Sequence, residues 1–175
     1  RMYFAYAAEL EGKGRDEDQI AYLRDCREYR NLLICELPRG DFAFTMARQF
    51  MLDAFGLVFL ERLQSSADAT LAGIAGKAIK ESRYHFRRSR DWVLRLGDGT
   101  AESHARIARA LEELWGYAAE MFQMDDGERR LARLPRQRVR REAFARWRAF
   151  PAARRDAGPH DQRAGRGGRA RLGGA

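Results

Sequence analysis

The segment 41–64 is apolar on nearly every side when it is drawn as a helix, and this restricts what the chain can fold into. A helix without a polar face is normally the buried central element of a helical bundle. We therefore predict a central helix that begins at Asp41 and ends near Gln64. Its apolar positions are Phe42, Phe44, Met46, Phe50, Met51, Leu52, Phe55, Leu57, Val58, Phe59 and Leu60.

Helical patterns also occupy the segments before this one. Residues 2–11 have the pattern of the end of a helix, closed by a turn at 12–14. Asp16 is placed to cap a second helix that continues to about Leu37, with apolar positions three, four or seven apart except across the middle. Pro38 and Gly40 then stop it. Because the chain starts at Arg1, already inside an apolar helical pattern, we expect that N-terminal sequence is missing.

Two further helices follow the apolar segment. Asp68 is placed to cap a helix to about Leu96, and Thr100 is placed to cap a last amphipathic helix that continues to about Phe122. No segment alternates as a strand does. Four long helices and a helix remnant, joined by short loops, predict antiparallel packing. The predicted fold is an all-α helical bundle, incomplete at the N-terminus.

Charge divides the chain near Gly127. The formal net charge is +8, but residues 1–127 carry −3 and residues 128–175 carry +11. The second part contains Arg, Ala, Gly, Pro and Leu in excess and has no Lys, Ile or Asn. We predict a bundle fragment over 1–127 and a disordered or artefactual Arg-rich tail over 128–175. A shift of reading frame in GC-rich DNA is the favoured origin, a natural disordered tail is second, and a nucleic-acid-binding arm is the least favoured.

Two cysteines and the hydropathy pattern bear on the compartment. Cys26 and Cys35 would lie roughly 13 Å apart on one helix, which is too far for a disulfide. Isolated thiols without CxxC spacing suit a reducing compartment. No run approaches the ~18 apolar residues that cross a bilayer, and no signal peptide is visible. We expect a cytoplasmic protein with no membrane partner.

Polar residues within apolar helix faces are the candidates for chemistry. Glu81 and His85 are four apart, on the face that the spacing predicts to be the core stripe, and Asp53 lies between Phe50 and Leu57. Inward carboxylates and a histidine are what a di-iron bundle uses, but its Glu-x-x-His spacing is absent. The favoured interpretation is a satisfied polar network or surface ion pairs, and a working metal site is the alternative. We assign no catalytic, metal-ligating or substrate-binding residue.

Five arginines crowd the helix that contains His85, at positions 83, 87, 88, 90 and 95. They can complement the dipole at the C-terminal end of that helix and form a solvated face, which is the favoured interpretation. The alternative is a surface for an anionic partner or a phosphate-bearing ligand.

The chain resembles a known family over residues 2–125. The similarity is strongest in "RYHFRRSRDWVLRLGDGT" within 77–107, and it extends to "YAAELEGKGRDED" (6–18), "RNLLICELPRGDFAFTMARQF" (30–50) and "ALEELWGYAAEMF" (110–122). These stretches are similar to the C-subunit family (PaaC) of ring-1,2-phenylacetyl-CoA epoxidase, whose members are ferritin-like. The resemblance ends near Gly127.

The resemblance implies a structural rather than a catalytic role. In this family the C subunit lacks a functional di-iron site and pairs with a catalytic A subunit, which carries the iron and epoxidises phenylacetyl-CoA in aerobic phenylacetate degradation. The expected cofactor content of this chain is therefore none, with a di-iron centre in the partner. Asp53, Glu81 and His85 would be vestigial core polar residues. The alternatives are a di-iron oxygenase in its own right and, less favoured, a nucleic-acid-binding protein.

Overall fold

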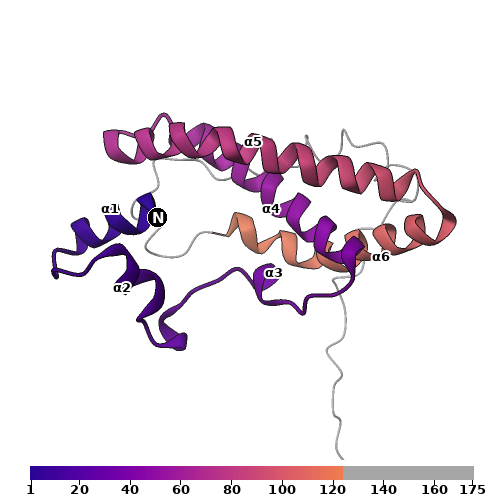
Figure 1. Cartoon of the computed structure of the whole chain (residues 1–175), viewed down its shortest axis with the longest axis horizontal. Helices are drawn as coiled ribbons and strands as arrows, with labels where there is room; N and C mark the ends of the chain where they lie inside the picture. Colours follow the sequence, from indigo (N-terminus) through magenta and orange to yellow (C-terminus); the bar gives the residue numbers. More distant parts are fainter. Residues whose placement is uncertain (124–175) are drawn as a thin grey trace, which may run out of the picture.

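Residues 1–123 of the chain are described by a computed structural model, and every regular element in this part is helical (Figure 1). Three long helices dominate, and shorter helices precede and follow them. The elements are α1 (Met2–Glu11), α2 (Glu17–Tyr22), η1 (Cys26–Glu28), α3 (Leu33–Glu36), α4 (Phe42–Leu63), α5 (Ala69–Gly97), α6 (Ala101–Ala118) and η2 (Glu120–Phe122). The predicted all-α class is confirmed. The expected tail over 128–175 lies outside the described residues.

Each long helix begins at the capping residue that the sequence predicts. The carboxylate of Asp41 accepts a hydrogen bond from the backbone N–H of Phe44 at 2.8 Å, and Asp68 accepts one from Leu71 at 2.9 Å. The Thr100 hydroxyl accepts one from Ser103 at 3.2 Å. These bonds satisfy backbone donors that a helix leaves unpaired in its first turn. The starts of α4, α5 and α6 are therefore determined locally.

The core lies where α4 packs between α5 and α6, as Figure 1 shows. Phe50 on α4 is 1% exposed and stacks on Phe86 of α5, with ring centroids 5.7 Å apart. From α6, Ile107 and Leu114 close the same cluster. Burial of these large apolar side chains is the main force that holds the three helices together.

By length and composition alone, α4 could cross a membrane. Its apolar residues instead pack inside the protein, where Ala47, Phe50 and Val58 are almost fully buried. The predicted position of this helix at the centre of the bundle is confirmed. A core helix passes the same composition test as a membrane span, so the packing explains its apolar character.

The prediction of a single helix over 16–37 is wrong. The chain forms α2, η1 and α3 there, so the described part has three long helices rather than four. Asp16 and Asp25 each form a capping box, with Gln19 and Glu28 respectively, and each therefore starts a new short helix. The lapse in apolar spacing across the middle of this segment marks where the helix breaks.

The two cysteines are free, as expected, and both are exposed, but they do not lie on one helix as predicted. Cys26 lies in η1 and Cys35 in α3, so two separate elements carry them. Partial burial raises the pKa of the Cys35 thiol. A raised pKa keeps that thiol protonated and weakly nucleophilic.

The turn between α5 and α6 is tight and satisfies the end of α5. The Ser103 hydroxyl donates to the Leu96 carbonyl at 2.8 Å, and Nδ1 of His104 lies 2.8 Å from the Gly97 carbonyl oxygen. A Cβ at Gly99 would lie 2.9 Å from the Arg95 carbonyl oxygen, which leaves no room for a side chain. This turn returns α6 antiparallel to α5 and places it against α4.

Candidate functional site

Asp53 links α4 to α5 through hydrogen bonds. Ser89, 1% exposed and the buried polar residue of the described core, donates from its hydroxyl to Oδ2 of Asp53 at 2.7 Å. Nε2 of Gln49 donates to Oδ1 of the same carboxylate at 2.7 Å. Both oxygens of Asp53 are thus engaged, as a satisfied polar network requires.

Glu81 and His85 do not lie on the core face, contrary to the prediction. Their side chains are 79% and 45% exposed, and Oε1 of Glu81 lies 3.5 Å from Nε2 of His85 on the surface of α5. The buried face of α5 instead passes through Ile79, Ser89 and Val93. The buried face is rotated about the helix axis relative to the predicted stripe. The rotation is smaller than about 100°, which is the angle between successive residues of a helix. The predicted stripe also contained position 89, so the error was one of rotation, which placed His85 on the core side in place of Val93.

The three candidate residues therefore do not converge on one point. Asp53 faces α5 from α4, while Glu81 and His85 face solvent from α5. Within residues 1–123, no three His, Cys, Asp or Glu side chains converge as a metal ion would require. These residues do not fit a di-iron centre, which needs several inward carboxylates and histidines together.

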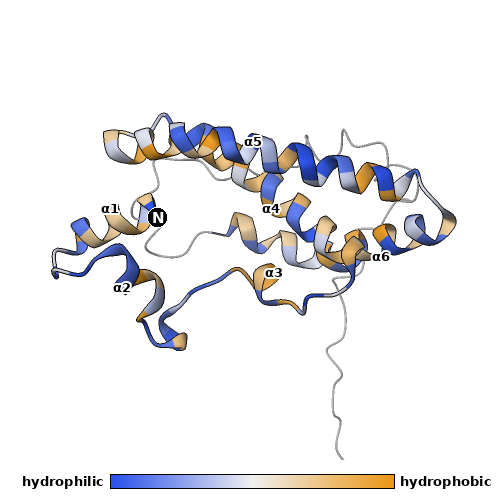
Figure 2. Cartoon of the chain, in the orientation of Figure 1, coloured by the Kyte–Doolittle hydropathy of each residue, from blue (hydrophilic) through white to orange (hydrophobic). Residues whose placement is uncertain are grey.

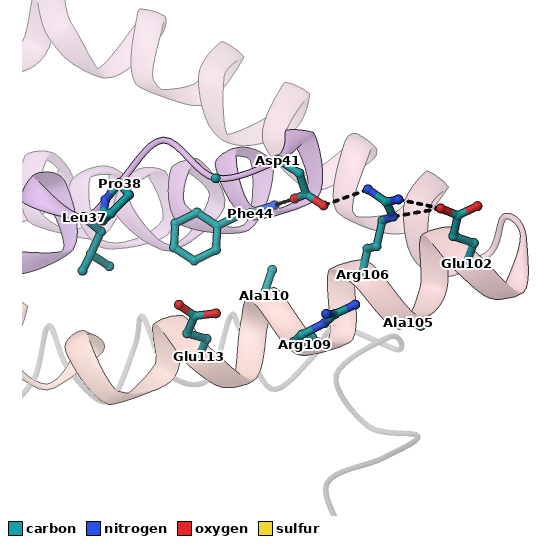
Figure 3. Close-up of a pocket in the computed structure, with 11 residues that line it drawn as sticks. Leu37, Pro38, Asp41, Phe44, Glu102, Ala105, Arg106, Arg109, Ala110 and Glu113 are labelled. Atoms are coloured by element: carbon teal, nitrogen blue, oxygen red, sulfur yellow. Dashed lines mark hydrogen bonds and ion pairs between the residues drawn. The ribbon is translucent and has the colours of Figure 1, made fainter.

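A surface groove of about 650 Å³ lies between α6 and the connection that leads into α4 (Figure 3). Phe44 and Ala110 lie in its wall, and charged side chains line its rim. Its described lining residues are Leu37, Pro38, Gly40, Asp41, Phe44, Glu102, Ala105, Arg106, Arg109, Ala110 and Glu113.

The connection that forms one wall of the groove is fixed to α4. Nη1 of Arg48 donates to the Leu37 carbonyl at 3.0 Å, and the Thr45 hydroxyl donates to the Arg39 carbonyl at 3.1 Å. Gly40 has φ of 65°, and a Cβ there would lie 2.7 Å from Phe44. Only glycine suits that backbone conformation and that close approach. The wall is therefore rigid rather than a free loop.

Arg106 bridges the two sides of the groove. Its guanidinium lies 3.3 Å from Oδ2 of Asp41 and 2.6 Å from Oε1 of Glu102, as the dashed lines in Figure 3 mark. The backbone N–H of Phe44, together with Arg106, holds the pKa of the Asp41 carboxyl below its usual range. Both partners stay charged at neutral pH, so the bridge persists there.

Arg109 and Glu113 give the groove charges of both signs that the described part of the chain does not pair. Neither side chain forms an ion pair within the described part of the molecule. The lining contains carboxylates, guanidinium groups and apolar surface, without a histidine, cysteine or serine among its described residues. Such a set can hold a polar segment, but it offers no activated nucleophile.

Sequence reasoning missed this groove. The only local signal was the Pro38-Arg39-Gly40-Asp41 turn, which we interpreted as a helix stop and cap. Arg106 is 65 positions from Asp41, so their pairing depends on how α6 packs against the start of α4.

Comparison with known proteins gives two similarities. A family model described as phenylacetic acid catabolic protein matches residues 1–150. The C subunit of 1,2-phenylacetyl-CoA epoxidase from Escherichia coli (strain K12) is 48% identical over 126 residues, which are 72% of this chain and 50% of that protein. The chain thus spans about half the length of this curated relative. Both similarities confirm the resemblance seen in the sequence, and the family match extends past residue 127, where we expected the resemblance to end.

Proposed function

The chain belongs to the phenylacetic acid catabolic protein family, and from this premise we propose that it serves as a structural C subunit of a phenylacetyl-CoA epoxidase in aerobic phenylacetate degradation. In this role it scaffolds a catalytic subunit and carries out no chemistry of its own.

The observation that carries the non-catalytic role is the hydrogen bonding of Asp53. Both carboxylate oxygens accept hydrogen bonds, from Ser89 and Gln49, within the contact between α4 and α5. An inward carboxylate on such a helix pair would be expected to bind iron in a di-iron bundle. Here the carboxylate stabilises helix packing, and Phe50 and Phe86 fill the adjacent space.

The partner that we propose is the catalytic A subunit, which would hold the di-iron centre. Similarity to a protein named as one subunit of an epoxidase supports an assembly with other subunits. A structural subunit of this kind contributes rigid surfaces, and the anchored wall of the groove at Gly40 is one such surface.

We propose that the protein works in the cytoplasm. Two exposed free thiols, at Cys26 and Cys35, suit a reducing compartment. The packing of α4 in the core supports a protein that does not span a membrane.

Metal analysis of the protein purified with added ferrous iron tests the non-catalytic role. We expect an iron content near background, with purified A subunit as the positive control. About two irons per chain, the content of a di-iron bundle, would contradict the proposal. Co-purification with tagged A subunit tests the scaffolding role separately, and absence of a stable complex would contradict that part.

A further inference from the structure

The helix α5 concentrates the positive charge of the described bundle. Its residues 69–97 include seven Lys or Arg and two acidic side chains, a net charge of +5. The remainder of residues 1–123 carries −6. Figure 2 shows hydrophilic residues along much of α5 and hydrophobic residues along much of α4. The positive charge of the described bundle is therefore concentrated on one helix.

The basic residues surround a hollow on the outer side of α5. This hollow measures about 260 Å³, and Tyr84, Arg87, Arg88, Asp91, Trp92 and Arg95 line it. Positions 84, 88, 91 and 95 step by three and four, so they share one face. That face points away from the buried Ser89 and Val93. We call these six residues the α5 basic face.

Two arginines of the α5 basic face have no partner in the described part of the chain. Arg87 and Arg88 form no ion pair or hydrogen bond there, and Asp91 is already bound by Arg90 at 2.9 Å. Some arginines elsewhere are paired, as Arg15 is with Glu11 and Arg106 is with Glu102. The α5 basic face differs in placing two adjacent unpaired guanidinium groups at one hollow.

This arrangement works against the stability of the isolated helix. Basic side chains three or four positions apart repel one another, as Lys80 and Arg83 do, and as Arg83 and Arg87 do. The helix dipole does not compensate for them, because its effect is limited to the last turn, where Arg95 is the only basic residue. The favourable interaction with the helix dipole, which we expected for all five arginines, therefore explains only Arg95.

From these observations we infer that the α5 basic face docks an acidic surface of a partner subunit. Exposed guanidinium groups form bidentate hydrogen bonds with carboxylates. Tyr84, which is 61% exposed, adds an aromatic contact beside them. A protein partner fits better than nucleic acid, because the −6 charge on the rest of the described bundle repels an extended polyanion. This inference rests on the proposed function, since the partner is the A subunit of the same assembly.

A charge-reversal experiment tests the docking surface. The affinity of the full chain for purified A subunit is measured by titration at low and high salt, for the wild type and for R87E/R88E. We expect R87E/R88E to weaken binding about tenfold or more at low salt, with a smaller loss at high salt. The matched control is R27E/R30E, which changes the same charge at exposed arginines outside α5, and its affinity should stay within about twofold.

The outcomes separate the two proposals. Failure of the wild type to bind the A subunit would overturn both the scaffolding role and the docking surface. Wild-type binding with equal affinity for R87E/R88E would overturn the docking surface alone. Loss of duplex DNA binding in R87E/R88E, with A-subunit affinity unchanged, would show that the α5 basic face serves nucleic acid instead. Circular dichroism checks that both variants keep the helical content of the wild type.

Photo-crosslinking locates the contact directly. A benzoylphenylalanine at Tyr84 should crosslink to the A subunit, and the crosslinked peptide should be rich in Asp and Glu. The same group at Tyr22, which is 76% exposed in α2, is the control and should not crosslink. Crosslinking from Tyr22 but not from Tyr84 would overturn the inference.

Discussion

The α4–α6 bundle and the N-terminal segment over residues 1–41 are stabilised in different ways. In the bundle, Phe50, Val58, Val93, Ile107 and Leu114 are at most 2% exposed. In residues 1–41 the buried apolar side chains are Ala8, Ile20 and Ile34 alone, while Tyr22 and Leu23 are about three-quarters exposed. The bundle therefore has a core of its own, and the N-terminal segment does not.

Ile34 enters the core of the bundle, and polar contacts also attach the N-terminal segment. The Tyr6 hydroxyl donates to Oδ2 of Asp68 at 2.6 Å, which ties α1 to the start of α5. The backbone N–H of Leu33 donates to Oε2 of Glu120 at 2.7 Å, which ties α3 to η2. Single hydrogen bonds of this kind contribute less to stability than burial of an aromatic side chain. The same chain thus combines a stable bundle with an attached segment of low local stability.

The largest expected effect on stability comes from truncating one aromatic side chain in each region and comparing the two losses. Phe50→Ala should lower the free energy of unfolding by about 3–5 kcal/mol, because it leaves a cavity in the core. The control Phe4→Ala, at a side chain that is 40% exposed in α1, should lower it by less than about 1 kcal/mol. Urea unfolding followed by circular dichroism measures both. Equal losses would mean that α1 is part of the core.

Removal of the Ser89 hydroxyl should have the next largest effect on the free energy of unfolding. Ser89→Ala leaves Oδ2 of Asp53 without its donor inside the α4–α5 contact and should lower the free energy of unfolding by about 1–2 kcal/mol. Ser82→Ala, on the same helix and half-buried, is the matched control and should have little effect. An equal loss in the two variants would contradict a specific role for the hydrogen bond.

Loss of the cap of α4 should have a smaller effect. Asp41→Ala removes both the cap and the carboxylate that Arg106 binds, and it should lower the free energy of unfolding by about 1 kcal/mol. The same urea titration measures this change. A loss confined to the N-terminal segment would contradict the assignment of Asp41 to the bundle.

The lowered pKa of Asp41 also predicts that the stability of the protein depends on pH. Its pKa is lower in the folded protein than its ordinary value of about 3.9, so its contribution is complete above that value. The contribution is lost as the pH falls through the folded pKa. Asp41→Asn keeps a capping oxygen but cannot titrate, so it should flatten the decline of stability below about pH 4. Asp98→Asn, at an exposed carboxylate, is the control, and an equal flattening there would contradict the assignment.

The smallest effect should be confined to α1. Tyr6→Phe removes the hydrogen bond to Asp68 and should speed amide hydrogen exchange in Met2–Glu11 while leaving the urea midpoint unchanged. Tyr3→Phe, at a tyrosine for which no hydrogen bond is described, should change neither quantity. A shift of the urea midpoint in Tyr6→Phe would mean that α1 unfolds together with the bundle.

The parts of the fold that the sequence predicted correctly depend on nearby residues. Asp41, Asp68 and Thr100 cap the first turns of α4, α5 and α6, and each bond joins residues three apart. The long apolar run of α4 likewise predicts its burial from composition. Over 16–37 the apolar spacing suggested one helix, but the local capping boxes at Asp16 and Asp25 proved stronger than that weak periodicity.

The candidate site was less predictable because it depends on how the helices are rotated and which of them meet. The predicted and buried faces of α5 both contain position 89, and packing against α4 selects the side with Val93 over the side with His85. The groove likewise requires Arg106 of α6 to reach Asp41. Such contacts join residues far apart in the chain, and no local spacing encodes them.

By itself, the sequence determined the helical class, the starts of the long helices, the central position of α4 and the family. The tertiary structure decided that Asp53 bonds to Ser89 and Gln49, that Glu81 and His85 face solvent, and that Arg87 and Arg88 are left unpaired on one outer face. The physical reason is the distance along the chain over which each interaction acts. Capping and helical periodicity act within one or two turns, whereas the orientation of a helix about its axis is set by the total burial that all of its neighbours offer.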